Sequence, residues 1–186
     1  MNNLIENIGQ NMLGKWESLA VEARPNPWGG QYFLKRYFEN TAQQAHATLV
    51  FYTDETAQDL NITIEVIGPF TFLQPSTVVS GAVDTDFEFT RIAVTPHSQG
   101  MVDMLNGDPK PYLNTWEADV RQEVNVNGQS VMGMTIGQYK EYDLLKVEDD
   151  KLYYGERPAD GSAPDELSKR ATSLQVPLKK VEKFSI

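Results

Sequence analysis

Gly14-Lys15-Trp16-Glu17-Ser18 is the stretch of sequence that decides the fold. It begins the first strand-like run, residues 14–24, and comes directly after a helix-like lead over residues 1–13. Trp16 is the largest side chain of this run, and we expect it to point into the core of an all-β domain. The apolar residues of the lead, which recur at helical spacing, are Leu4, Ile5, Ile8 and Met12.

Downstream of this run the chain keeps a period-two alternation of apolar and polar residues, the pattern of half-buried strands. The clearest example is residues 60–66, where leucine, isoleucine and valine alternate with polar residues. Gly68-Pro69 interrupts that strand, and a bend or bulge is expected there because proline cannot donate to a sheet. Strands are predicted over residues 14–24, 31–40, 46–54, 60–66, 70–72, 77–95, 116–126, 129–138, 141–147, 151–157 and 172–182.

Turn signals and one further helix separate these strands. Residues 97–105 predict a short helix that ends at Asn106-Gly107. Asn127-Gly128 is a two-residue turn signal, so residues 116–126 and 129–138 are expected to pair as a hairpin.

The pattern predicts one domain over residues 1–186, with about eight to ten antiparallel strands and short N-terminal and mid-chain helices. Antiparallel strands in this number close into a barrel or form a sandwich. Residues 158–169 are polar, with proline, glycine and serine, and are expected to form a surface loop.

Composition excludes several classes of function. The chain has 186 residues, no cysteine and a formal net charge of −10. The negative charge argues against nucleic acid or an anionic membrane as a partner, and no stretch is apolar enough for membrane insertion. Because the sequence has neither cysteine nor a secretory signal, we expect a cytoplasmic protein.

No sequence pattern for a cofactor or a metal is present. The chain has no GxGxxG, no P-loop and no GxSxG. Its two histidines, His46 and His97, lack the HExxH spacing, and Asp84, Asp86 and Glu88 lack the loop of an EF-hand. We therefore expect neither a metal site nor a cofactor.

Gly14-x-Trp16 resembles the opening motif of the lipocalins, and longer strings are similar to one repeat of the adenomatosis-polyposis-coli down-regulated family. These strings run in order from Gly14 to Leu178 and are GKWES, VEARP, YFLKRYF, LVFYTDE, YYGERPADGS and KRATSLQVPL. The resemblance implies a lipocalin-like (calycin) barrel that holds an apolar or lipid-like ligand. It also implies that Gly14 lets the chain turn tightly and that Trp16 plugs the closed end of the barrel.

Animal members of that family are membrane-anchored inhibitors of Wnt signalling, with cysteines, a signal peptide and two repeats. This chain has no cysteine, and Val21 stands where the family pattern leads us to expect one. The resemblance therefore implies a stand-alone, Cys-free microbial member rather than a Wnt inhibitor. It further implies an arginine stacked on Trp16, for which Arg157 and Arg170 are the candidates.

Several charged residues could orient a ligand inside such a barrel. Glu22 and Arg24 share strand parity with Trp16, so we expect them inside, unless they lie in solvent at the rim. Inside the barrel they would be head-group anchors or a mutual ion pair. Arg36 could bind a carboxylate through its guanidinium, or form a structural bridge to Glu22 or Asp54.

Aromatic residues would supply an apolar lining, although core packing is the alternative for most of them. Trp28, in a loop flanked by proline and glycine, is expected to be a lid or an interaction anchor. The predicted ligand-binding residues are Arg24, Trp28, Arg36, Phe70, Phe87, Phe89, Trp116 and Tyr139.

Three functions stay open at this point. The first is binding of a small hydrophobic or lipid-like ligand inside the barrel cavity. The second is a cofactor-free isomerase or cyclase acting on an apolar metabolite in the same cavity, with His97, Glu22 and Tyr52 as candidate catalytic residues. The third is an interaction module whose barrel is filled by its own side chains.

Overall fold

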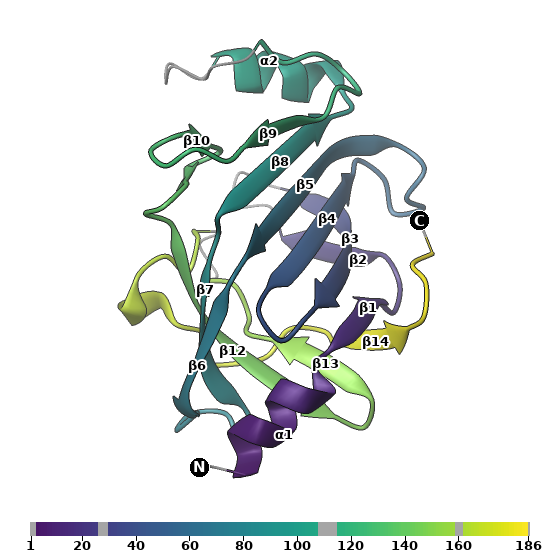
Figure 1. Ribbon diagram of the computed structural model, residues 1–186. Coiled ribbons are helices and arrows are strands. Elements are labelled where there is room, and N and C mark those ends of the chain that lie inside the picture. The colour runs from purple at the N-terminus through teal and green to yellow at the C-terminus, as the bar shows by residue number, and fades with distance from the viewer. Residues whose placement is uncertain (1–2, 26–29, 108–114, 159–161, 186) are drawn as a thin grey trace.

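The structure, a computed structural model, describes residues 3–25, 30–107, 115–158 and 162–185. One antiparallel sheet dominates it, with a helix near each end (Figure 1). No helix in these described ranges is long and apolar enough to cross a membrane.

The helices are α1 (Asn3–Asn11), α2 (Gln99–Gly107) and a single 3-10 turn, η1 (Leu167–Lys169). The strands of the main sheet are β1 (Gly14–Ser18), β2 (Glu22–Pro25), β3 (Gln31–Asn40), β4 (Ala45–Tyr52), β5 (Leu60–Gly68), β6 (Phe70–Pro75), β7 (Val83–Glu88), β8 (Arg91–Pro96), β9 (Gln122–Val124), β12 (Lys140–Glu148), β13 (Lys151–Tyr154) and β14 (Leu178–Val181). A separate small hairpin joins β10 (Ser130–Val131) to β11 (Met134–Thr135).

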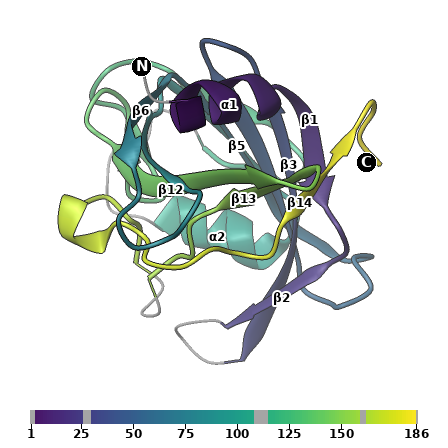
Figure 2. The same ribbon diagram turned by 90° about the horizontal axis from the view of Figure 1, so that it is seen from below.

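The main sheet curls until its two ends meet on one bent strand. Paired strands follow the order β6-β7-β12-β13-β14-β1-β3-β4-β5. Because β6 follows β5 directly through Gly68-Pro69, both ends of this path belong to the same long strand. Figure 2 shows the resulting curled, barrel-like sheet end-on. The predicted all-β, lipocalin-like fold class is confirmed.

The predicted bend at Gly68-Pro69 is confirmed too, and the paired strand β7–β8 bends beside it. Glu88 N donates to Pro69 O at 3.0 Å and Thr90 N donates to Ile67 O at 2.9 Å, which carries the pairing across the bend. A Cβ on Gly68 would lie 1.7 Å from the Glu88 backbone oxygen, so the two strands can approach this closely only with glycine.

The expected single strand over residues 14–24 is split into β1 and β2. Glu17 pairs with Tyr37 and Glu22 with Leu34. Between these two pairs the segment that runs from β1 to β2 therefore has two more residues than β3. An excess of two residues preserves the side-chain alternation. Glu22 therefore faces the same side as Trp16, as its parity predicts.

Side chains pack tightly at the end of the barrel that α1 covers. Trp16 is 1% exposed and Met12 0%, and Trp16 Nε1 donates to Met12 O at 2.8 Å. The Phe38 ring stacks on Tyr154 with centroids 4.3 Å apart. The predicted arginine stack on Trp16 is wrong, because the cation over this ring is Lys180, at 5.2 Å from the centroid.

The predicted hairpin between residues 116–126 and 129–138 is wrong as well. Only β9 forms a strand in the first segment, and it pairs with β8. Asn127-Gly128 is a local turn, closed by a hydrogen bond from Gln129 N to Val126 O at 2.9 Å. Of the alternating valines only Val124 is buried in the core, whereas Val120 and Val126 are 43% and 55% exposed.

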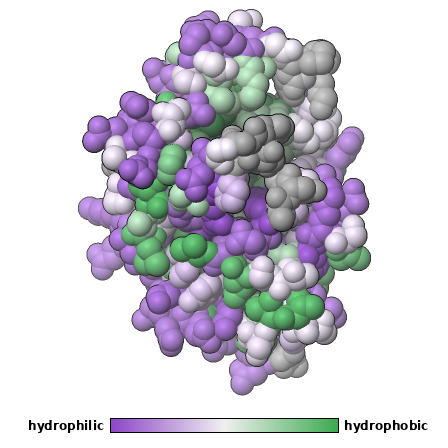
Figure 3. Space-filling view, turned by 180° about the vertical axis from the view of Figure 1, so that it is seen from behind, coloured by the Kyte–Doolittle hydropathy of each residue, from purple (hydrophilic) through white to green (hydrophobic). Residues whose placement is uncertain are grey.

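The outer surface is mostly hydrophilic on the face in Figure 3, with separate hydrophobic patches between the charged residues. On the outer side of β3 and β4 a second apolar cluster is formed by Tyr37, Val50 and Tyr52. Phe184, after β14, packs against it with its ring 5.5 Å from that of Tyr37.

Candidate functional site

The candidate site is the barrel interior at the end remote from α1. Register places Tyr32, Leu49 and Phe51 on the same face of β3 and β4 as the core residue Phe38. All three are only partly buried although they face inward, and the Tyr32 and Phe51 rings lie 5.6 Å apart. These three side chains therefore keep part of their surface accessible although they face the interior, whereas Trp16 and Met12 at the α1 end are fully buried.

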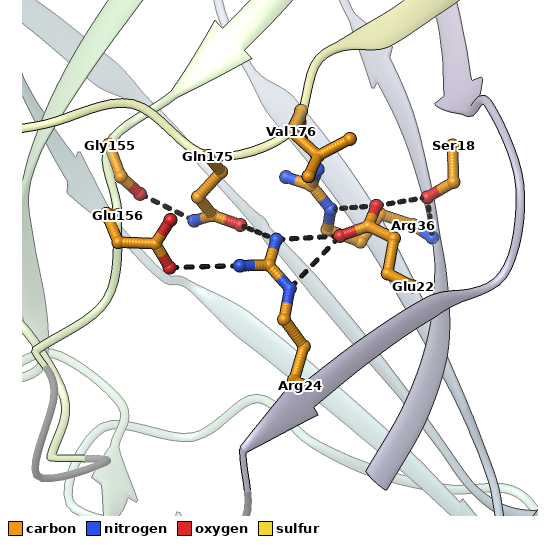
Figure 4. A network of polar contacts seen from close by, with 8 residues as sticks. All are labelled: Ser18, Glu22, Arg24, Arg36, Gly155, Glu156, Gln175 and Val176. Atoms are coloured by element: carbon orange, nitrogen blue, oxygen red, sulfur yellow. Dashed lines mark hydrogen bonds and ion pairs between the residues drawn. The ribbon is translucent and has the colours of Figure 1, made fainter. Parts of the chain in front are cut away.

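A network of ion pairs centred on Glu22 lies beside these side chains (Figure 4). Glu22 Oε1 accepts from Arg36 Nε at 2.8 Å and from Ser18 Oγ at 2.7 Å. Its other oxygen, Oε2, accepts from Arg24 Nη2 at 2.7 Å. Of the alternatives expected for Glu22, Arg24 and Arg36, the geometry is that of a mutual ion pair and a structural bridge.

The network spans a gap in the barrel wall. β1 pairs with β14 as far as Ser18 and Leu178, whereas β2 has β3 as its only paired strand among the described elements. Across the gap Arg24 donates to Glu156 Oε1 and to Gln175 Oε1, both at 2.9 Å, and Arg36 Nη2 donates to Val176 O at 2.6 Å (Figure 4).

An open depression of about 490 Å³ lies at this gap. Its apolar walls include Leu19 and Val176, each 49% exposed, and its charged lining includes Glu22, Arg24 and Glu156. The wall of the barrel is therefore closed here by side chains rather than by a backbone ladder.

Burial and charge compete at the centre of the network. Burial raises the pKa of Glu22, but the charge of Arg36 and the hydrogen bonds from Ser18, Arg36 and Arg24 outweigh it. The pKa of Glu22 therefore lies below its usual range. Burial likewise lowers the pKa of Arg36, against the opposing charge of Glu22.

A second buried group faces the interior from β12. Register places Glu141 opposite Phe87 and Asp143 opposite Thr85, on the face that carries core residues. Glu141 Oε1 accepts from Arg157 Nη1 at 2.7 Å and from the Tyr139 hydroxyl at 2.9 Å. This group was missed from the sequence, although its parity with Leu145 in a predicted strand was a usable signal.

Asp143 is the most perturbed carboxyl of this group. Its Oδ1 accepts from Leu144 N at 2.6 Å and from Gly155 N at 2.7 Å. Burial raises the pKa of Asp143 to about 7, and the nearby Glu141 charge adds to the effect while Arg157 and the backbone donors oppose it. Asp143 can therefore exchange a proton near neutral pH.

Tyr154 connects the two groups. It is 3% exposed, and its hydroxyl accepts from Asn40 Nδ2 at 3.4 Å. Burial raises the pKa of Tyr154, and the charges of both Asp143 and Arg36 act on it.

The aromatic candidates lie in several environments. Phe70 and Phe87 pack in the core with centroids 6.1 Å apart, and Phe89 stacks on Tyr139 at 5.7 Å. Trp116 is 2% exposed in the same core, and its backbone N donates to Asn106 Oδ1 at 2.8 Å.

The candidate catalytic residues are not brought together. His97 lies between Asp119 Oδ1, at 2.7 Å, and Thr63 Oγ1, at 3.0 Å, and Thr63 is on the outer face of β5. Tyr52 belongs to the outer apolar cluster, and Glu22 to the ion-pair network. Trp28 lies outside the described residues, and those residues contain no group of three metal-ligating side chains.

Comparison with known families gives one match that covers nearly all of this architecture. The family described as Adenomatosis polyposis coli down-regulated 1 matches residues 3–185. The match includes α1, every strand of the curled sheet and both polar groups of the interior.

Proposed function

Since the chain belongs to the Adenomatosis polyposis coli down-regulated 1 family, we propose that it binds a small hydrophobic or lipid-like ligand inside its barrel. The family and the barrel-like fold are compatible with ligand binding, and the interior provides the reason to propose it. Binding would be driven by burial of apolar surface, worth roughly 25 cal/mol per Å².

The accessible surface of inward-facing side chains is the observation that carries this proposal. An inward-facing leucine or phenylalanine in a barrel filled by its own side chains is expected to be as buried as Trp16 or Phe38. Leu49 and Phe51 keep part of their surface accessible instead. A ligand that covered this surface would complete the core at the end remote from α1.

Titration with apolar probes tests the proposal. A panel of a fatty acid, a retinoid and a polyketide-like molecule should quench tryptophan emission saturably, because Trp116 lies in the same core. Flat titrations across the whole panel would contradict ligand binding.

Adjacent positions on β4 provide a matched pair of variants. Leu49 faces inward, whereas its neighbour Thr48 faces outward. Leu49→Phe should fill the interior and weaken probe binding about tenfold, while Thr48→Phe should leave it unchanged. Equal affinities for the two variants would place the probe outside the barrel.

One observation favours an enzymatic alternative, a cofactor-free isomerase or cyclase in the same cavity. Asp143 faces the interior with a pKa of about 7, which suits a general acid or base at neutral pH. Under this alternative Asp143→Asn would abolish turnover of an apolar metabolite while leaving its binding intact. Retained turnover in the variant would remove Asp143 from the chemistry.

A further inference from the structure

We propose that the ligand of this barrel has an uncharged polar head, such as an alcohol, ester or amide, and not a free carboxylate or ammonium. This inference rests on the proposed function and names the class of molecule that the interior accepts. Two independent observations carry it: the glutamates and arginines of the interior are already paired with one another, and the buried polar atoms without a partner are neutral.

The ion-pair network has no carboxylate or guanidinium without a partner. Each oxygen of Glu22 accepts from a guanidinium, and Oε1 also accepts from Ser18. Arg24 donates to Glu156 on its far side, and Arg36 donates to the Val176 carbonyl. A ligand carboxylate entering here would compete with Glu22 for both arginines.

The group on β12 is paired in the same way. Glu141 accepts hydrogen bonds from Arg157 and from the Tyr139 hydroxyl. Apart from Asp143, which holds a proton below its pKa of about 7, the charges of the two groups therefore balance within the described part of this end of the barrel. The cations are Arg24, Arg36 and Arg157, and the anions are Glu22, Glu141 and Glu156.

Among the residues that the structure describes, the buried side-chain atoms that lack a partner on the inner face are all uncharged. They are Asn40 Oδ1, Trp116 Nε1 and Gln122 Oε1. Asn40 is two residues after Phe38 on β3 and so faces the same side of the sheet. Gln122 pairs with the core residue Val94, and Trp116 belongs to the core. Asn40 lies at the α1 end, where its Nδ2 donates to Met12 O, so the end remote from α1 offers one neutral donor, Trp116 Nε1, and one neutral acceptor, Gln122 Oε1.

The physical consequence is selectivity by charge. A ligand ion would enter a low-dielectric interior with no counter-ion available, which is strongly unfavourable. A neutral head would instead satisfy a buried donor or acceptor that is otherwise unpaired. Neutral and ionised ligands with the same chain should therefore differ in affinity although they bury the same apolar area.

A panel with one chain length tests this. Decanol, decanamide, decanoate and decylammonium would compete with a bound fluorescent probe at pH 6, where Asp143, with its pKa of about 7, is mostly protonated. We expect the two neutral compounds to bind at least about tenfold more tightly than either ion, a factor that corresponds to about 1.4 kcal/mol. Decanoate that binds as tightly as decanamide would overturn the neutral-head inference and leave ligand binding intact. Failure of all four would overturn both.

Charge-balance variants provide a second readout. Glu22→Gln would release Arg24 and Arg36 from their anion, so decanoate affinity should rise about tenfold relative to decanamide. Glu141→Gln releases Arg157 and should act in the same direction if Glu22→Gln does not fold. Unchanged selectivity in a folded variant would show that the paired charges do not govern the choice of head group.

Discussion

At the scale of single residues, the Glu22–Arg36 pair is buried enough to matter for stability. The two side chains are 4% and 5% exposed, and their atoms lie 2.8 Å apart. Removing one partner of a buried pair leaves the other charge uncompensated. Breaking the pair is therefore expected to lower the free energy of unfolding strongly, whatever the intact pair contributes to it.

Glu22→Gln should lower the free energy of unfolding by about 3–5 kcal/mol, because Arg36 would stay buried without a counter-ion. Urea unfolding at pH 7 measures this. Glu39→Gln is the matched control, since Glu39 pairs with Lys15 at 3.9 Å in solvent and should cost under about 1 kcal/mol. Similar losses in both variants would contradict the buried pair.

Asp143 predicts a pH dependence with a definite sign. Its pKa is about 7 in the folded protein against an ordinary value of 3.8, so the folded state binds the proton more tightly. The free energy of unfolding should therefore fall as the pH rises from about 4 to about 7. The fall is on the order of 4 kcal/mol, at about 1.4 kcal/mol per pKa unit.

Asp143→Asn should remove this contribution and make the protein more stable than the wild type at pH 8, because its amide oxygen can still accept from Leu144 N and Gly155 N. Thermal melts at pH 5 and pH 8 measure the difference. Asp84→Asn, on the neighbouring strand β7, should not change the pH dependence. A variant destabilised equally at both pH values would show that Asp143 is charged in the folded state.

Sequence parity was a good guide to single residues where strands are regular. It placed Trp16 and Glu22 on one face. Of the two bridging partners expected for Arg36, Glu22 and Asp54, the structure shows Glu22. It could not name Lys180 as the cation over Trp16, because that contact depends on the β1–β14 register. Asp143 was missed because its perturbed pKa arises from burial, which composition does not reveal.

At the scale of elements, the bend shared by β5–β6 and β7–β8 is what lets the sheet return to its starting strand. Gly68 makes this bend possible through close contact rather than through unusual dihedral angles. A Cβ there would lie 1.7 Å from the Glu88 oxygen. The glycine is thus required by the closure of the barrel.

Gly68→Ala should prevent folding or cost more than about 4 kcal/mol, because backbone atoms on β7 cannot move aside cheaply. Soluble yield and circular dichroism measure this. Gly100→Ala, in α2 with 4.0 Å to the nearest atom, should be neutral or stabilising by up to about 1 kcal/mol. A well-folded Gly68→Ala variant would rule out the close approach of Gly68 to the Glu88 backbone.

Elements with uniform alternation were predictable, and those that depend on tertiary contacts were not. Residues 60–66 and the Gly68-Pro69 bend follow from pattern and from proline chemistry. The segment 116–126 alternates as clearly, yet only Gln122–Val124 finds a partner strand. Alternation states which residues could share a face but not whether a neighbouring edge is available.

At the scale of the whole molecule, the barrel has two unlike ends. The α1 end is closed by Ile8, Met12 and Trp16, each at most 1% exposed. The other end has inward-facing side chains such as Leu49 that are only partly buried. This asymmetry predicts different costs for truncating similar side chains.

Ile8→Ala should cost about 2–5 kcal/mol, because it leaves a cavity in a packed core. Leu49→Ala should cost less, because the leucine makes fewer contacts in the ligand-free protein. Chemical unfolding of both variants measures the two costs. Equal costs would show that the interior is filled at both ends.

The most direct measurement of the central claim is a methyl NMR titration of the protein with decanol. Ligand inside the barrel should shift the inward-facing methyl groups of Leu49, Ile62 and Ile64, while the outward-facing Val50 and Ile67 stay nearly unchanged. Saturable shifts confined to the inward set are the result that interior binding predicts. Shifts confined to Val50 and Ile67, or no shifts at all, would contradict it.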